Sequence, residues 1–110
     1  MLLTDRRSVA ANSTEANVLA GKTQEFCSVP SLIRFGNTAA AVGLFVTIIV
    51  GNEVIVDDQE ASAQNRLPID PDDYWAEAGA KAGDRIVVKL RNSTGAAIIG
   101  FTGVKITPLA

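Results

Sequence analysis

Two groups of carboxylates are the residues of this sequence best suited to acid–base or metal chemistry. They are Asp57, Asp58 and Glu60, and Asp70, Asp72, Asp73 and Glu77. A general acid–base pair requires an enclosed, desolvated setting, whereas the surrounding residues predict polar, solvated loops. Calcium binding in the loop of residues 57–77 is the alternative, but DPDD lacks the spaced oxygen ligands and central glycine of an EF-hand. We predict no catalytic residue, no metal site and no cofactor.

The remaining reactive side chains do not complete a nucleophilic site. Cys27 is the single cysteine and the sequence has no histidine, the usual general base and the commonest transition-metal ligand. We interpret Cys27 as a small buried residue. A single cysteine cannot form an internal disulfide, which favours a reducing compartment, and MLLTDRRSVA lacks the order of a signal peptide. The chain is therefore predicted not to be an enzyme and not to be secreted.

The composition is that of an ordinary globular domain. The chain has 110 residues, of which 47% are hydrophobic and 20% charged, and its formal net charge is -2, so it does not belong with disordered or nucleic-acid-coating chains. The longest apolar run, residues 39–50, is shorter than the ~20 residues of a transmembrane helix. We therefore predict no membrane span.

The segment LFVTIIVGNEVIVDD predicts a β-hairpin, because β-branched residues dominate it on both sides of Gly51 and Asn52. A two-residue loop would pair Val50 with Glu53 and mix charge into both faces. A three-residue loop separates the faces better. It pairs Val50 with Val54, Ile48 with Val56 and Ile49 with Ile55, with a core face of Val46, Ile48, Val50, Val54 and Val56.

That register leaves Ile49 and Ile55 outward, beside Thr47 and Asp57. An outward apolar pair must be covered either by another part of the same chain or by another chain. We weigh the two kinds of cover equally. Cover by another chain would make this pair part of an interface.

The rest of the sequence favours further short strands. Residues 23–38 predict two strands with a bend at Pro30, residues 83–92 alternate in hydrophobicity, and two strands follow. Residues 70–82 allow one short helix. We predict an all-β, antiparallel, jelly-roll-like β-sandwich of about seven to eight short strands in residues 23–110, preceded by an N-terminal arm or edge strand in residues 1–22. An immunoglobulin-like strand order is the alternative.

Two further groups of side chains are candidates for binding. Arg85, Lys89 and Arg91 form a basic row on the outward side of one predicted strand. The acidic composition makes a solvated face or a row of subunit salt bridges a better interpretation of this row than nucleic-acid binding. Tyr74 and Trp75 are expected to close one end of the sandwich or, alternatively, to form a ligand platform.

The succession of GNEVIVDD, PIDPDDYW and AGDRIVVKLRNST, ending in ITPL, resembles the small β-sandwich virion proteins of bacteriophages, which include capsid cement or decoration proteins and single jelly-roll capsid proteins. The resemblance implies a homo-oligomer, with a trimer favoured, bound to a major capsid protein. It also implies assembly in the host cytoplasm and residence in the virion. The N-terminal residues are not basic enough for genome binding.

Two functions follow as hypotheses. The preferred one is a structural virion protein that stabilises or decorates a viral capsid by self-association and by binding capsid subunits. The alternative is a β-sandwich module that binds a carbohydrate or another surface ligand through Tyr74 and Trp75. The predicted interface of the preferred function consists of Thr47, Ile49, Ile55, Arg85, Lys89 and Arg91.

Overall fold

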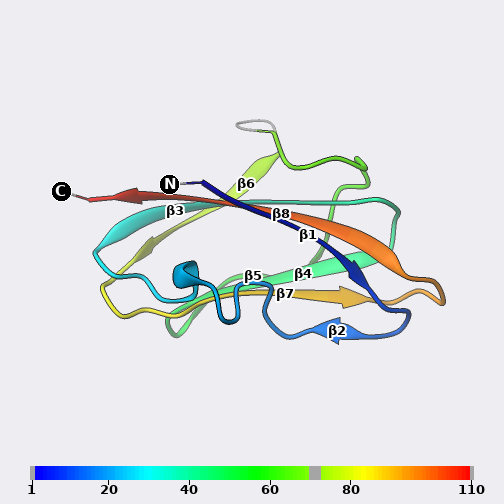
Figure 1. Ribbon diagram of the computed structural model, residues 1–110, viewed down its shortest axis with the longest axis horizontal. Coiled ribbons are helices and arrows are strands. Elements are labelled where there is room, and N and C mark those ends of the chain that lie inside the picture. The colour runs from blue at the N-terminus through cyan, green and yellow to red at the C-terminus, as the bar shows by residue number, and fades with distance from the viewer. Residues whose placement is uncertain (1, 70–72, 110) are drawn as a thin grey trace.

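The computed structural model describes residues 2–69 and 73–109, which form two antiparallel sheets packed face to face (Figure 1). An all-β antiparallel sandwich is therefore confirmed. The elements in chain order are β1 (Leu2–Val9), β2 (Thr14–Glu15), the 3-10 helix η1 (Thr23–Glu25), β3 (Ser31–Ala39), β4 (Leu44–Val50), β5 (Glu53–Glu60), β6 (Tyr74–Ala80), β7 (Ile86–Asn92) and β8 (Ile98–Pro108).

The strand pairings are nested within one another. Sheet A has the order β1-β8-β3-β6 and sheet B the order β2-β7-β4-β5. The first strand thus lies beside the eighth, the second beside the seventh, the third beside the sixth and the fourth beside the fifth. The chain can be followed as one long hairpin, closed between β4 and β5, that wraps around to make both sheets.

The core lies between the sheets and follows the alternation of the sequence. Ile33 and Phe35 of β3 are fully buried, as are Ile86 and Val88 of β7, because alternate residues of each strand face the core. β4, which lies beside β7 in sheet B, contributes Leu44, Val46, Ile48 and Val50. Alternating apolar residues on both sheets therefore fill the space between them.

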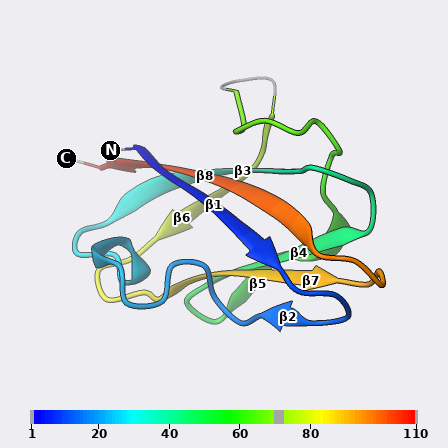
Figure 2. The same cartoon turned by 45° about the vertical axis from the view of Figure 1, so that its right-hand side comes forward.

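The N-terminal residues are part of the sandwich. β1 pairs with β8 from Leu2 to Val9, and β2 pairs with β7. Residues 16–22, which connect β2 to η1, close one side of the molecule (Figure 2). Val9, Val18 and Leu19 are buried in the core. The predicted boundary at residue 22 therefore does not separate an arm from the sandwich, and the edge-strand interpretation holds for residues 2–9.

Charged side chains on the inner side of β1 explain why this strand is hard to recognise from the sequence. Asp5 and Arg7 lie on the same side of β1 as the core residue Val9, and Asp5 binds Arg7 at 2.8 Å and Lys22 at 3.0 Å. Burial alone would raise the pKa of Asp5, but hydrogen bonds from Arg7 and Lys22 outweigh it and hold the pKa below its usual value. This strand therefore lacks the apolar alternation that identifies the others.

Residues 74–80 form β6, so the helix allowed within residues 70–82 is not present in the described part of that range. Residues 70–72 lie outside the described residues. β6 pairs with β3 and turns Ala78 and Ala80 toward the core. Pairing along β3 satisfies the backbone groups of this segment, while Gly79 weakens a helix. Pairing with β3 therefore outweighs the local preference of this segment for a helix.

The β4–β5 hairpin has a two-residue turn, so the prediction of a three-residue loop is wrong. Val50 lies opposite Glu53, and Gly51 has a φ of 61°, as required at the first position of a tight two-residue turn. One extra residue then restores the predicted pairing of Ile48 with Val56. The β-bulge therefore allows a two-residue turn while the apolar residues further along the hairpin still share the core face. Val54 is 54% exposed and does not belong to that face.

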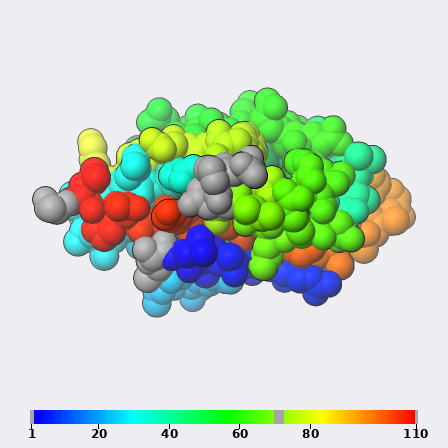
Figure 3. All heavy atoms as spheres, turned by 90° about the horizontal axis from the view of Figure 1, so that it is seen from above, coloured from blue at the N-terminus to red at the C-terminus, as the bar shows by residue number. Residues whose placement is uncertain are grey.

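Part of the outer face of sheet A is covered by the chain itself. The segment after β5 crosses it, as the green spheres of Figure 3 show. Ser62 forms a bridge to Thr38, the Thr38 hydroxyl donates to the Arg66 carbonyl, and Pro68 lies close over Gly36. Tyr74 adds its buried ring over Gly103.

Gly103→Ala is expected to lower the free energy of unfolding by about 1–3 kcal/mol, because overpacking must displace a buried ring. A Cβ at this position would overlap the Tyr74 hydroxyl and lie 2.8 Å from its Cζ. Gly79→Ala is the matched control, since no heavy atom lies within 4 Å of its added Cβ. Urea denaturation of both variants checks the prediction, and equal midpoints would contradict it.

Candidate functional site

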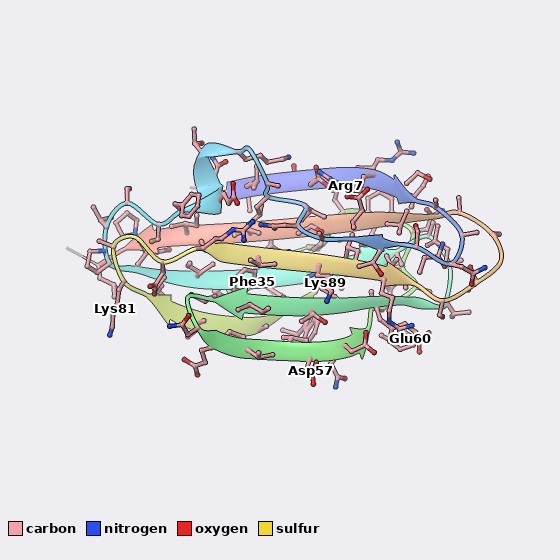
Figure 4. All side chains as sticks on the ribbon, turned by 90° about the horizontal axis from the view of Figure 1, so that it is seen from below. Arg7, Phe35, Asp57, Glu60, Lys81 and Lys89 are labelled. Atoms are coloured by element: carbon pink, nitrogen blue, oxygen red, sulfur yellow. The ribbon has the colours of Figure 1, made fainter. Side chains whose placement is uncertain are left out.

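The outer face of sheet B carries the best candidate site. Its side chains come from β7, β4 and β5, and Figure 4 shows these strands from below with no other described segment crossing in front of them. Thr47 and Ile49 on β4 and Val87 on β7 are only partly buried. The residues that define this face are Phe45, Thr47, Ile49, Val54, Asp57, Asp58, Glu60, Val87, Lys89 and Arg91.

An apolar row crosses the whole width of this face. Ile49 lies opposite Val87 on one side and opposite Val54 on the other. Val54 takes the place predicted for Ile55, because the bulge turns Ile55 toward the core, where it is partly buried. The outward apolar pair predicted from the sequence is therefore corrected to Ile49 and Val54, extended by Val87.

Arg91 contacts two side chains on the outer face of sheet B. Its guanidinium lies 4.5 Å from the centre of the Phe45 ring and forms a 2.8 Å ion pair with Asp58. The hydrogen bond from Arg91 lowers the pKa of Asp58, and the positive charge of Lys89 acts in the same direction. Thr47 completes the contact by accepting a hydrogen bond from the Asp58 backbone N–H at 3.1 Å. These contacts fix a charged pair over an aromatic ring.

The predicted basic row is divided between two environments. Arg85 precedes β7 and binds Glu25 at 2.8 Å, which is a contact with the N-terminal part of the chain. Arg91 binds Asp58, whereas Lys89 is exposed and forms no ion pair with another described residue. Two of the three cations are therefore already paired with carboxylates, which leaves little of this row for a phosphate backbone.

Tyr74 and Trp75 do not form a two-ring platform. Tyr74 is buried against sheet A, with the Arg34 guanidinium 5.7 Å from its ring centre, whereas Trp75 is 46% exposed. The irregularity in the pairing of β3 with β6 falls at this point and separates the two side chains. Of these two residues, only Trp75 offers its ring to a ligand.

The carboxylate groups do not make a metal site among residues 2–69 and 73–109, where no group of three or more His, Cys, Asp or Glu side chains is placed to hold an ion. Asp57, Asp58 and Glu60 lie on β5, so the prediction of a loop there is wrong. Asp73 accepts hydrogen bonds from Arg66 and the Ile69 N–H, and Glu77 lies 3.9 Å from Arg34. Asp70 and Asp72 lie outside the described residues.

Cys27 is buried, as predicted, and its Sγ donates to the Val29 carbonyl at 2.9 Å. It borders a cavity of about 260 Å³ at the end of the sandwich, where Phe26, Val29 and Pro108 also lie. The lining is mainly apolar and contains no ionisable side chain besides the Cys27 thiol. The cavity therefore lacks the groups that acid–base chemistry would need.

Two contributors to the outer face of sheet B were not predicted from the sequence, namely Phe45 and Val54, and Val87 was predicted to point outward but was not included in the interface. Phe45 could have been found from the period-two pattern, because it alternates with buried neighbours. Val54 could not, since its direction depends on the bulge.

No protein-family model, curated protein sequence or solved structure matches this chain significantly. In the described part of the chain, no helix has the length and apolar character needed to cross a membrane.

Proposed function

We propose that this chain is a structural protein of a virus particle, which stabilises or decorates a capsid by associating with copies of itself and with capsid subunits. One observation carries the proposal. The chain covers part of the outer face of sheet A with its own residues 61–69 and Tyr74, whereas no other described segment crosses the apolar row of sheet B, in which Val54 is exposed and Ile49 and Val87 are partly exposed (Figures 3 and 4). A partly exposed apolar row bordered by charges is typical of a protein interaction surface.

The strand order supports the viral part of the proposal. Nested pairing of eight strands in two sheets is the arrangement of a jelly roll, a fold found in viral capsid proteins, lectins and cupins. We therefore infer a jelly roll rather than an immunoglobulin-like sandwich. One fold serves many functions, so the fold and the sequence resemblance to bacteriophage virion proteins do not by themselves carry the proposal. The proposal depends on the outer face of sheet B.

The geometry of this face suits assembly better than catalysis. Arg91, Phe45 and Asp58 already contact one another in the single chain, so a second surface can cover them in the arrangement that they have. Ile49 and its two cross-strand neighbours supply apolar area that becomes buried in the contact. Association would thus bury apolar area that is exposed to water in the isolated chain.

A ligand-binding module is the second candidate, favoured by the half-exposed ring of Trp75 on the edge strand β6. Aromatic rings of this kind bind the apolar faces of sugars and other ligands. With Tyr74 buried, this candidate depends on a single ring. A saturable change in Trp75 fluorescence on adding a carbohydrate would favour it over assembly.

Light scattering between about 5 and 500 µM tests the assembly function. We expect the mass to rise above 11.5 kDa with concentration, and Ile49→Asp to remain monomeric because it places a charge in the apolar row. Val42→Asp is the matched control, since Val42 is 69% exposed in the turn before β4 and is not among the residues that define the outer face of sheet B. Circular dichroism confirms that both variants are folded.

A mass of 11.5 kDa at every concentration would contradict self-association, as would equal behaviour of the two aspartate variants. Cosedimentation of the chain with capsid shells of the same virus tests the other half of the proposal. We expect saturable binding, and shells that sediment without the chain would contradict a capsid role.

A further inference from the structure

Each row of side chains across the outer face of sheet B has complementary ends. The register of β4 with its two neighbours defines three rows, read from β7 through β4 to β5. One row is apolar at both ends, and the other two are basic on β7 and acidic on β5. The rows are Val87–Ile49–Val54, Lys89–Thr47–Asp57/Asp58 and Arg91–Phe45–Glu60.

The middle row follows from a bulge in β5. Val46 lies opposite Gln59 and Ile48 opposite Val56, so Asp57 and Asp58 together oppose Thr47. Asp58 has a φ of 51°, the left-handed conformation that such an irregularity requires. Figure 4 shows Lys89 over the middle of the face and Asp57 at its β5 edge.

We propose that two copies of this chain pack through the outer face of sheet B about a twofold axis parallel to β4. This inference rests on the proposed function, because it assumes that the face carries self-association. Rotation about that axis places β7 of one copy over β5 of the other and keeps every row at its own level along the strands. The contact is isologous, so each cross-copy pair occurs twice.

The rotation converts the complementary ends into contacts. Lys89 lies over Asp57 of the second copy, and Val87 lies over Val54 of the second copy. Arg91, although paired with Asp58 in its own chain, lies near Glu60 of the second copy and adds to the attraction. Neither Lys89 nor Asp57 forms an ion pair with another described residue, so both are available for the new contact.

The alternative arrangements bring like charges together. An axis perpendicular to the strands would place Lys89 over the same residue of the second copy. Pairing the β5 edges of two copies would oppose Glu53, Asp57, Asp58 and Glu60 with one another, and charges on an edge strand disfavour such pairing. The axis along β4 is the arrangement that matches both charge and apolar surface.

The contact is small. β4 and β7 have seven residues each and β5 has eight, so the three strands span roughly 14 Å by 24 Å at normal strand spacing and rise. The area of this face is well below the ~800 Å² per partner that a standard stable interface buries. We therefore expect a weak, concentration-dependent dimer. Its occupancy rises when other contacts hold two copies close together, because these contacts raise the effective concentration.

Charge reversal tests the axis, with dissociation constants measured by sedimentation velocity on the full chain. Lys89→Glu and Asp57→Lys should each raise the dissociation constant about tenfold, because each change replaces two symmetric attractions with repulsions. The double variant should restore it to within about threefold of wild type. Lys81→Glu, at an exposed position on the loop after β6 (Figure 4), is the matched control and should have no effect.

The outcomes separate this inference from the proposed function. If wild type dimerises but the two single variants behave like Lys81→Glu, or if the double variant is no better than the singles, the axis is overturned and self-association stands. A trimer would likewise overturn the twofold contact while supporting assembly. A monomer at all concentrations would overturn both.

Discussion

Phe35→Ala is expected to lower the free energy of unfolding by about 3–5 kcal/mol, the largest effect of any single change considered for this chain. Phe35 has no exposed surface and lies on β3 in the middle of sheet A. Removing its ring loses the free energy of burying the apolar side chain and leaves a cavity, because backbone hydrogen bonds to β6 and β8 hold β3 in place. Urea denaturation followed by circular dichroism measures the loss.

Phe26→Ala is the matched control for this prediction. It removes the same atoms from a ring that is 55% exposed, so we expect a loss of less than about 1 kcal/mol. Similar losses at the two positions would show that the core is not centred between the sheets at Phe35, and the described packing would then be wrong.

Asn17→Ala is expected to cost about 3 kcal/mol, although the side chain is polar and small. Its amide nitrogen donates to the Ile86 carbonyl, and its oxygen accepts from the backbone N–H groups of Leu19 and Val88. Asn17 is buried, so alanine would leave three backbone groups without their partners and out of reach of bulk water.

Asn52→Ala is the control, because Asn52 is exposed in the β4–β5 turn, and there we expect a change within about 0.5 kcal/mol. The same urea titration applies to both asparagines. If Asn17→Ala were as mild as Asn52→Ala, the N-terminal segment would not be anchored to β7 as described.

Both predictions bear on assembly, because the outer face of sheet B is only as rigid as the sandwich behind it. Asn17 ties the N-terminal segment to β7, the strand that carries Val87 and Lys89. Deleting residues 1–21 would remove β1 and β2 along with this anchor. Such a truncation would report on folding, so point variants on the face are the sharper test of assembly.

The strands with regular apolar alternation could be predicted from the sequence. β7 shows it plainly, with Ile86, Val88 and Leu90 inward and Lys89 outward. β1 could not be recognised in the same way, because Asp5 and Arg7 occupy its inner side and Lys22, which forms an ion pair with Asp5, is distant in sequence. Long-range ion pairs leave no local signal in the chain.

The candidate site was predicted in part. Thr47, Ile49, Lys89 and Arg91 lie on the expected outward face, whereas Ile55 does not and Arg85 is held by Glu25. The error at Ile55 arises from register, since one bulged residue reverses the direction of its neighbours. Hairpin loop length alone does not reveal a bulge further along the strand.

The central claim is that copies of this chain associate through the outer face of sheet B, and dilution followed by NMR tests it most directly. Backbone amide shifts recorded at high and low concentration should change for Phe45, Thr47, Ile49, Val87 and Lys89, and stay constant on sheet A. Shifts that move only on β1 or β6, or nowhere, would contradict the claim.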